Sequence, residues 1–280
     1  MDSLCDRLAR FVKDRDMDEK DPNFVTALAR GLDVLRCFNP DRQELGTTEI
    51  ARLTGLAQST VWRLCYTLSQ YGCLTPGRTP DRLRIGAGVL LLGHAAVTHT
   101  GLAEVALPLM QKLANSFDAS CSLAERHRAS MVIVQRAEAP NIVKVNLHIG
   151  SGLDIVSSSL GLSWLAALPA AQRKPVLEEL KRANAGDWPR IKADIDEAQK
   201  DYERLGCVFN LGKSHADINA VGVPVVSLDG QHVMALTCGG ARSRLTRETL
   251  LKKVAPALKE LAGEIAPLLF FGGSAKAKHR

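Results

Sequence analysis

Apolar residues recur at three- and four-residue steps along two neighbouring segments, which predicts two amphipathic helices joined at Gly55. The inward-facing residues of the two helices are Ile50, Ala51, Leu53, Val61, Leu64, Cys65 and Leu68. We expect Thr47 or Thr48 to supply the oxygen that caps the first helix. Glu49 lies in the first turn, where the helix dipole stabilises a carboxylate.

The second helix leaves an amide, two hydroxyls and a guanidinium on its outward face, near its N-terminal half. These side chains are Gln58, Ser59, Thr60 and Arg63. Such a face suits the major groove of DNA, because Arg pairs with guanine, Gln with adenine, and hydroxyls with bases or phosphates. Two short helices around a glycine turn also occur in helical cores that contact no nucleic acid, so the pair alone leaves both interpretations open.

The residues that follow favour DNA binding. Residues 71–74 lead into an extended segment, residues 75–81 are typical of a turn, and residues 82–85 alternate polar and apolar positions as a returning strand. This hairpin is the expected wing of a winged helix-turn-helix, whose arginines would lie beside DNA phosphates. The predicted DNA-binding residues are Thr47, Thr48, Gln58, Ser59, Thr60, Trp62, Arg63, Arg78, Arg82 and Arg84.

Apolar spacing also predicts a helix from Phe24 that packs under this pair and ends before Asn39. Its inward residues are expected to be Val25, Leu28, Leu32, Leu35 and Phe38. After the hairpin, residues 87–100 form a short apolar helix, which we interpret as a linker whose surplus apolar surface is a dimer contact.

From residue 101 the pattern alternates between strand and helix. Helices are expected at 102–117, 158–168, after Pro169, 191–205 and 246–269, and strands at 120–125, 131–137, 142–149, 207–211, 221–228 and 232–238, with a turn at 150–152. This order predicts a mixed α/β domain with a largely antiparallel sheet flanked by helices. The predicted organisation is an arm (1–23), a winged helix-turn-helix domain (24–86), a linker helix (87–100), a second domain (101–271) and a disordered tail (272–280).

Composition agrees with a globular, cytoplasmic protein. The 280 residues carry a formal net charge of +6, and the segment 24–88 holds eight arginines, five acidic residues and no lysine. Arginine alone suits forked contacts to phosphate and guanine. The seven cysteines are scattered without a CxxC pair, which predicts reduced, buried thiols rather than a metal or redox site. Residues 1–20 lack the apolar core of a signal peptide, and no apolar run is long enough to span a membrane.

Catalytic patterns are missing from the sequence. Ser157, Ser158 and Ser159 would be the nucleophiles of a serine hydrolase, but no GxSxG, HExxH, Walker or GxGxxG pattern occurs. The lone histidines that could line a pocket, and that are more often surface or core groups, are His127, His148, His215 and His232. We therefore expect no enzyme, cofactor or metal.

Several segments together resemble the IclR family of bacterial transcriptional regulators, over roughly residues 24–271. The resembling segments are ALARGLDVLRCF, TTEIARLTGLAQSTVWRLCYTLSQYGCL, RLRIGAGVLLLG, SSSLGLSWLAALP, GVPVVSLDGQHVMALTCGG and RLTRE. The resemblance implies an α+β protein with a winged helix-turn-helix domain, a linker helix and a GAF-like effector domain. It also implies a dimer or dimer of dimers on double-stranded operator DNA, responding to a small molecule, with a carboxylic acid as the expected effector.

The same resemblance suggests where an effector binds. It implies backbone amides at the start of the helix at Ser158, Ser159, Leu160 and Gly161, and strand positions Asn210, Ala220, Thr237 and Gly239. A family lysine is replaced by Leu162, and among the strand positions only Thr237 keeps its hydroxyl, so the site is expected to take a bulkier acid than a two-carbon one, an aromatic acid among the candidates. Independently, a helix N-terminus attracts a carboxylate, although serines there can also act simply as caps. An architectural DNA-binding protein without an effector is the alternative.

Overall fold

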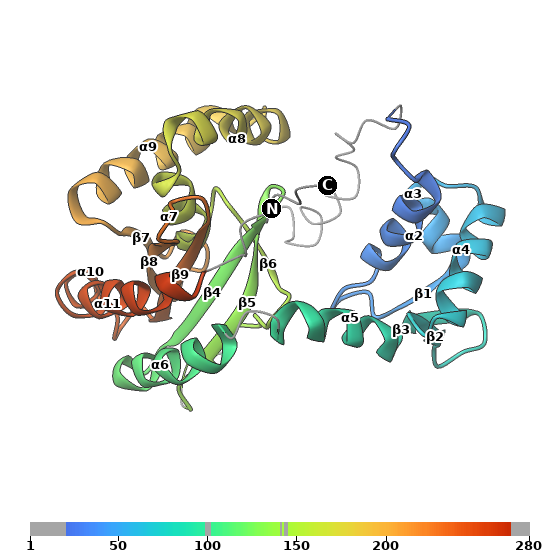
Figure 1. Cartoon of the computed structure of the whole chain (residues 1–280), viewed down its shortest axis with the longest axis horizontal. Helices are drawn as coiled ribbons and strands as arrows, with labels where there is room; N and C mark the ends of the chain where they lie inside the picture. The colour runs from blue at the N-terminus through green and yellow to red at the C-terminus, as the bar shows by residue number, and fades with distance from the viewer. Residues whose placement is uncertain (1–20, 99–101, 141, 143–144, 270–280) are drawn as a thin grey trace, which may run out of the picture. The chain divides into compact units, whose positions relative to one another are not determined.

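The computed structural model describes residues 21–98, 102–140, 142 and 145–269. Its contacts divide the chain into two compact units, with the division falling between Ala96 and Val97 in the sequence, and Figure 1 labels the elements of each in chain order. The predicted tail and residues 1–20 of the predicted arm lie outside the described residues. The domain limits expected from the sequence therefore stay predictions.

The first unit contains the predicted winged helix-turn-helix. Its elements are α2 (Thr26–Arg36), β1 (Glu44–Gly46), α3 (Thr47–Thr54), α4 (Gln58–Gln70), β2 (Leu74–Pro76) and β3 (Arg82–Ile85), followed by α5 (Ala87–Thr98). The strands pair antiparallel in the order β1-β3-β2. Strand β1 escapes sequence analysis because three residues are too few to show an alternation.

The helix pair is held by the predicted core. Ile50 and Val61 are fully buried, and Cys65 is nearly so. Gly55 ends α3 with φ +71°, in the left-handed region that favours glycine, and so forms the expected hinge. The threonine cap predicted for α3 is wrong: Gly46 is the N-cap residue, with extended backbone, and its N–H donates to Glu49 Oε2 at 2.8 Å. Because the chain enters directly from β1, Thr47 is already helical.

Helix α2 turns a different face inward from the one predicted. Val25, Leu28 and Leu32 are 63%, 64% and 47% exposed, whereas Val34 and Cys37 are buried. Leu35 and Phe38 pack against the core from its edge, as expected. The helix has apolar residues on two faces, and spacing alone does not say which one meets α4.

The second unit is the mixed α/β domain. Its elements are α6 (Leu102–Phe117), β4 (Ser120–His127), β5 (Ser130–Glu138), β6 (Gly152–Asp154), α7 (Ser159–Ala167), α8 (Ala170–Ala183), α9 (Trp188–Leu205), β7 (Val208–Leu211), β8 (Ile218–Val226), β9 (Val233–Ala241), α10 (Arg247–Thr249) and α11 (Ala255–Ile265). The strands form one antiparallel sheet in the order β6-β5-β4-β9-β8-β7, as predicted.

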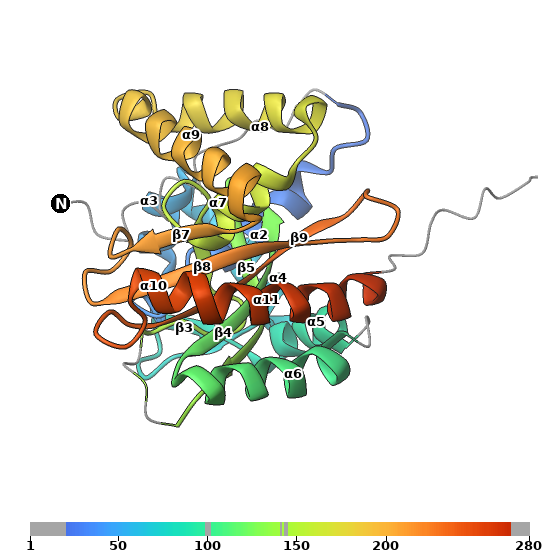
Figure 2. The same cartoon turned by 90° about the vertical axis from the view of Figure 1, so that its left-hand side faces the viewer.

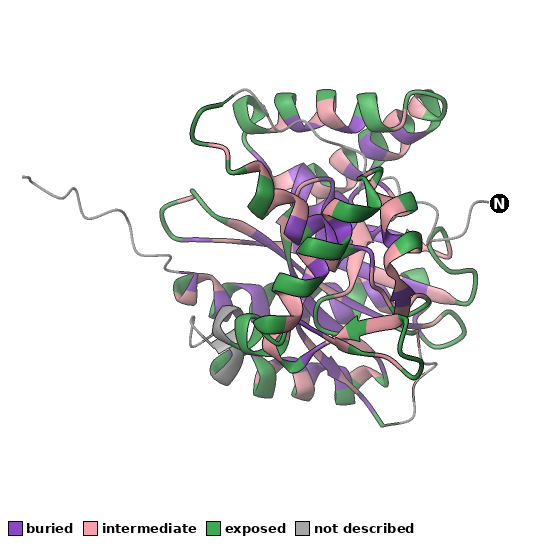
Figure 3. Cartoon of the chain, turned by 90° about the vertical axis from the view of Figure 1, so that its right-hand side faces the viewer, coloured by how far each residue is buried: buried purple, intermediate pink, exposed green. Residues whose placement is uncertain are grey.

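Helices cover both faces of this sheet (Figure 2). One face is apolar and packs against α6 and α11 through a cluster that includes Met110, Leu236 and Leu258. The opposite face meets α7, whose residues from Ser159 to Ala166 are all buried. Helix α8 lies further out and exposes most of its residues, with Val176 and Leu180 as its buried ones (Figure 3).

The strand predicted at 142–149 is wrong, because the described residues of that segment form bends and a turn. The edge of β5 is instead occupied by β6, where Ser130 pairs with Asp154 and Val132 with Gly152. The predicted turn is present at Gly150, with φ +87°, but Gly152 already belongs to the strand. Val145 and Leu147 alternate with polar residues but lie in a loop. A short alternation of apolar and polar residues can therefore occur in a segment that pairs with no strand.

The predicted closing helix is interrupted. It consists of α10, a π-helical turn (Leu250–Val254), α11 and a 3₁₀ turn (Ala266–Leu268). In the π turn the N–H of Ala255 donates to the carbonyl of Leu250. Pro256 follows at once, and because its ring lacks an N–H and crowds the carbonyl four residues earlier, a wider turn relieves the clash.

Candidate nucleic-acid interface and ligand site

Helix α4 presents the predicted polar face to solvent. Gln58, Ser59 and Arg63 are exposed and Thr60 is half-buried. Gln58 Nε2 donates to Thr48 Oγ1 at 3.0 Å, so the amide of α4 is tied to the start of α3. Thr48 therefore orients a neighbouring side chain, a role that its position in the sequence does not reveal.

Two aromatic rings extend this face along α4. Trp62 and Tyr66 are both exposed and stack with centroids 5.6 Å apart and planes 15° apart. Tyr66 is missing from the residues predicted from sequence, although its spacing of four from Trp62 places both rings on one side of a helix. The pair forms a flat apolar surface beside Arg63.

The three wing arginines have different surroundings. The Arg78 side chain is 90% exposed; its Nε lies 3.7 Å from Glu44 Oε1, and its backbone N–H donates to the same carboxylate. Arg84 is exposed as well, with Nε 3.3 Å from the carbonyl of Pro76. Arg82 instead bridges elements: its Nη1 lies 2.9 Å from Glu49 Oε2 and 3.0 Å from the carbonyl of Glu44. Arg82 therefore joins the wing to α3 and β1.

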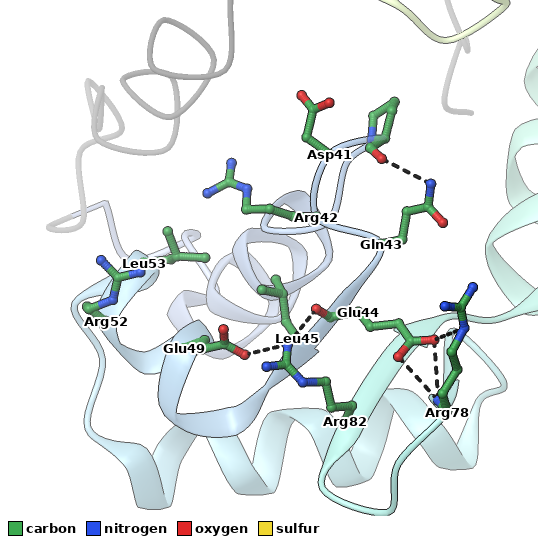
Figure 4. A pocket seen from close by; sticks show the side chains of 11 residues that line it. Asp41, Arg42, Gln43, Glu44, Leu45, Glu49, Arg52, Leu53, Arg78 and Arg82 are labelled. Carbon is green, nitrogen blue, oxygen red and sulfur yellow. Dashed lines mark hydrogen bonds and ion pairs between the residues drawn. The ribbon is translucent and has the colours of Figure 1, made fainter. Parts of the chain in front are cut away.

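A charged hollow of about 470 Å³ lies between α3, β1 and the wing (Figure 4). The arginines and carboxylates that line it are Arg42, Arg52, Arg78, Arg82, Glu44 and Glu49. Mixed charges of this kind differ from the apolar lining of small-molecule sites. We therefore assign the hollow to the polar surface of the winged unit and not to a small-molecule site.

The start of α7 shows how the predicted effector serines are used. Ser158 caps the helix: its Oγ accepts from the N–H of Gly161 at 3.0 Å and donates to the carbonyl of Asp154 at 2.8 Å. Ser159 Oγ lies 2.9 Å from Thr237 Oγ1, and Thr237 in turn donates to the carbonyl of Val221. Capping thus occupies one amide that was expected to receive a carboxylate, whereas the Ser159–Thr237 pair joins the helix to the sheet.

Two glycines let α7 approach its neighbours. A Cβ on Gly161 would lie 2.2 Å from Ile155 Cα, and one on Gly222 would lie 2.3 Å from the carbonyl oxygen of Ser159. Leu160 is buried between them. Gly161 is therefore required for packing, and its N–H faces Ser158 rather than an open site.

The remaining predicted effector positions lie in one row of the sheet. Asn210 faces Ala220 and Ala220 faces Gly239 across β7, β8 and β9. Asn210 is buried, and its amide donates to Ser157 and Ser214 while its oxygen accepts from two backbone N–H groups. The hydrogen bonds of the Asn210 amide hold a loop in place. Asn210 therefore shapes the predicted site rather than offering a free polar group to a ligand.

Sequence analysis missed three polar residues on the α7 side of the sheet. Ser122 is buried on β4, and Arg136 on β5 donates from Nη1 to Ser122 Oγ at 2.7 Å. Arg136 also lies 2.7–2.8 Å from Glu138 Oε1 through Nη2 and Nε. The two charged residues near the end of the apolar strand MVIVQRAE are the signal that could have identified Arg136 and Glu138.

The hydrolase alternative gains no support from these contacts. The Ser158 and Ser159 hydroxyls hydrogen-bond to backbone groups and to Thr237, none of which is a base. Within the part of the chain that the structure describes, no group of three His, Cys, Asp or Glu residues could hold a metal ion. Among the same residues, no helix combines the length and apolarity needed to cross a membrane.

The described cysteines are free and buried, as predicted: Cys37, Cys65, Cys73, Cys121, Cys207 and Cys238. Burial raises the pKa of the Cys37 and Cys65 thiols to about 11 and that of Cys238 to about 12. These thiols are protonated at neutral pH and so are poor nucleophiles.

Comparison with known proteins finds a matching family for each of the two units. The family described as "Bacterial transcriptional regulator IclR C-terminal" matches residues 94–266, and the "IclR helix-turn-helix domain" matches residues 27–76. These families consist of transcriptional regulators rather than enzymes.

Relatives match over nearly the whole chain. The HTH-type transcriptional regulator TsaQ1/TsaQ2 of Comamonas testosteroni is 28% identical over 92% of this chain and 94% of its own length. The Pca regulon regulatory protein of Pseudomonas putida is 27% identical over 89% and 86%.

Solved structures agree. An IclR-family transcriptional regulator from Brucella abortus has a TM-score of 0.80 and 37% identity, covering 91% of this chain and 96% of its own. An IclR homolog from Microbacterium hydrocarbonoxydans, complexed with 4-hydroxybenzoate, has a TM-score of 0.70 and 25% identity over 87% and 98%.

Proposed function

The chain belongs to the IclR family of bacterial transcriptional regulators, and we propose that it binds double-stranded operator DNA with an affinity that changes when a small organic acid binds its second unit. The exposed polar face of α4 is the observation that carries the DNA part of the proposal. Its amide, hydroxyls and guanidinium match the donors and acceptors of base edges in the major groove.

The DNA contacts divide by role. Arg63 reads a base edge from α4, with Gln58 held in position by Thr48. Arg78 and Arg84, exposed on the wing, neutralise phosphates. Arg82 braces the wing from inside, and its ion pair with Glu49 reduces the charge it offers to DNA.

The exposed surface of the linker helix supports binding as a two-fold pair. Leu90, Leu91 and Leu92 of α5 are all exposed, and three adjacent leucines in water are a typical contact between copies. Two copies would place two α4 helices on two half-sites, as dimeric helix-turn-helix proteins do. Whether the assembly is a dimer or a tetramer is measured directly by light scattering of the purified protein.

An aromatic acid is the effector class that the relatives favour. One relative is named as the p-hydroxybenzoate hydroxylase transcriptional activator of Acinetobacter baylyi, and a structural relative holds 4-hydroxybenzoate. In this chain the Ser159–Thr237 hydroxyl pair, at the contact of α7 with β9, supplies polar groups beside small residues such as Ala220 and Gly239. Small side chains at these sheet positions favour an acid bulkier than a two-carbon one.

DNA binding is tested by substitution on α4 and the wing. Arg63→Ala should weaken binding to the preferred duplex by about 1–3 kcal/mol and relax sequence preference at one position. Arg84→Ala should reduce the salt dependence of binding by about one unit without changing preference. Binding of fluorescent duplexes from the gene's own neighbourhood, followed by anisotropy at several salt concentrations, separates the two effects.

Lys174→Ala, an exposed change on α8, is the matched control and should alter neither quantity. An equal loss on all sequences for Arg63→Ala would reassign that residue to phosphate. Failure of the wild-type protein to bind any of the duplexes at low salt would refute the proposal. An architectural protein, by contrast, would bind DNA but show no rise in melting temperature with any aromatic acid, since ligand binding to the folded state raises stability.

A further inference from the structure

A line of polar side chains crosses the α7 side of the sheet. Thr237 on β9 lies directly opposite Ser122 on β4, and Ser122 lies directly opposite Arg136 on β5. Residues that face each other in an antiparallel pair project from the same side of the sheet. Because the Thr237 hydroxyl contacts Ser159 of α7, this whole line faces α7.

Arg136 is the charged member of the line, and it is largely buried. Only 9% of its side chain is exposed, against 36% for Glu138. Removing a guanidinium from water costs free energy unless it is paired, and here Glu138 and the Ser122 hydroxyl pair it. The opposite face of the sheet packs through an apolar cluster, so this buried charge lies on the α7 side alone.

The guanidinium lies close to the hydroxyls already assigned to the effector. Its Nη1 contacts Ser122, and neighbouring strands are roughly 5 Å apart, so it lies about one strand spacing from the Thr237 side chain. Ser122 lies between the two in the strand register, so a carboxylate bound over Ser122 would have the Arg136 guanidinium on one side and the Thr237 hydroxyl on the other. Arginine binds carboxylates through two parallel hydrogen bonds and stays charged at all relevant pH values.

The start of α7 is a weaker anion site by comparison. The N–H of Gly161 already donates to Ser158, so this amide is not free for a ligand. Arg136, in contrast, offers a permanent positive charge on the same side of the sheet as the Ser159–Thr237 pair.

We propose that Arg136 recognises the carboxylate of the effector and that Glu138 occupies the guanidinium until the effector arrives. This inference rests on the proposed function, because it names the residue that selects an acid for the site. The effector carboxylate would share or replace the bonds that Glu138 makes, while Ser122 keeps the guanidinium in place.

The test compares an acid with its neutral amide. Isothermal titration calorimetry measures the affinity of the full-length protein for 4-hydroxybenzoate and for 4-hydroxybenzamide. The wild type should prefer the acid, and Arg136→Gln should lose at least about tenfold in affinity for the acid while its affinity for the amide stays within about twofold. Arg244→Gln is the matched control: it removes an arginine from a surface ion pair with Asp118 and should change neither affinity.

Glu138→Gln supplies an independent readout that does not remove the buried cation. It deletes the competing carboxylate, so affinity for the acid should rise about threefold or more while affinity for the amide is unchanged. Its result decides the matter if Arg136→Gln fails to fold.

The outcomes separate this inference from the proposed function. A wild type that prefers the acid, with Arg136→Gln weakening both probes equally or Glu138→Gln changing neither, would overturn the role of Arg136 and leave the effector class standing. A wild type that binds neither probe would overturn the aromatic-acid effector and this inference together.

Discussion

The contact between α7 and β8 at Gly222 gives a prediction whose sign and size follow from the structure. Gly222→Ala would place a Cβ 2.3 Å from the carbonyl oxygen of Ser159 and 3.0 Å from Ser163 Oγ. For the first contact to reach van der Waals distance, α7 must move away by roughly 1 Å. That displacement also weakens the 2.9 Å hydrogen bond between Ser159 and Thr237.

The expected loss of unfolding free energy combines three effects. Overpacking of this kind typically costs about 1–3 kcal/mol. The weakened hydrogen bond costs about 1 kcal/mol more. Replacing glycine restricts the unfolded chain and returns about 0.4–1 kcal/mol. The net loss is therefore about 1–3.5 kcal/mol.

Gly263→Ala is the matched control, with the opposite expected sign. Gly263 is exposed within α11, and nothing lies within 4 Å of the Cβ that alanine would add. The same substitution should therefore stabilise the protein by about 0.5–1 kcal/mol through helix propensity.

Urea unfolding followed by tryptophan fluorescence measures both changes. A Trp62→Phe background removes the only tryptophan of the first unit and leaves Trp164 and Trp188 to report on the second. If Gly222→Ala unfolds within about 0.5 kcal/mol of the parent protein, or both substitutions shift stability in the same direction, the packing argument is wrong.

Three further predictions follow from single contacts. Thr237→Val removes the hydroxyl that meets α7 and should weaken 4-hydroxybenzoate binding about tenfold by calorimetry; an unchanged affinity would remove Thr237 from the site. Arg82→Ala breaks the partly exposed ion pair with Glu49 and should lower local stability by about 0.5–1 kcal/mol, measured as faster hydrogen exchange of the wing amides. It should change the salt dependence of DNA binding less than Arg84→Ala does. A larger change for Arg82→Ala would instead show that Arg82 contacts a DNA phosphate. In a Cys5→Ser background, Cys238 should resist Ellman's reagent at pH 8 until the protein unfolds, because a pKa of about 12 leaves roughly one thiolate in ten thousand. Since folding raises this pKa from 9.0, the stabilisation is complete below pH 9 and is lost as the pH rises towards 12, which unfolding measurements across that range should show.

Much of the first unit follows from local pattern. Gly55, the spacing from Val61 to Leu68 and the turn residues after Gly72 specify two helices and a hairpin without reference to any distant residue. The long strands and helices of the second unit are also predictable from the sequence, since their hydrophobic periodicity is strong. Short elements such as β1 and β6 are not, because three residues become strands only where a partner edge is available.

The sequence by itself determined the order of the elements, the polar face of α4 and the family likeness, because these depend on residues close together in the chain. Tertiary structure decided which face of α2 packs, that Gly46 rather than a threonine caps α3, and that Arg82 is bound to Glu49. It alone brought Ser159, Thr237, Ser122 and Arg136 into one line, from a helix and three strands separated by up to 115 positions. Side chains that come together through strand register leave no local pattern, since the pairing is fixed by the whole sheet and not by their neighbours in sequence.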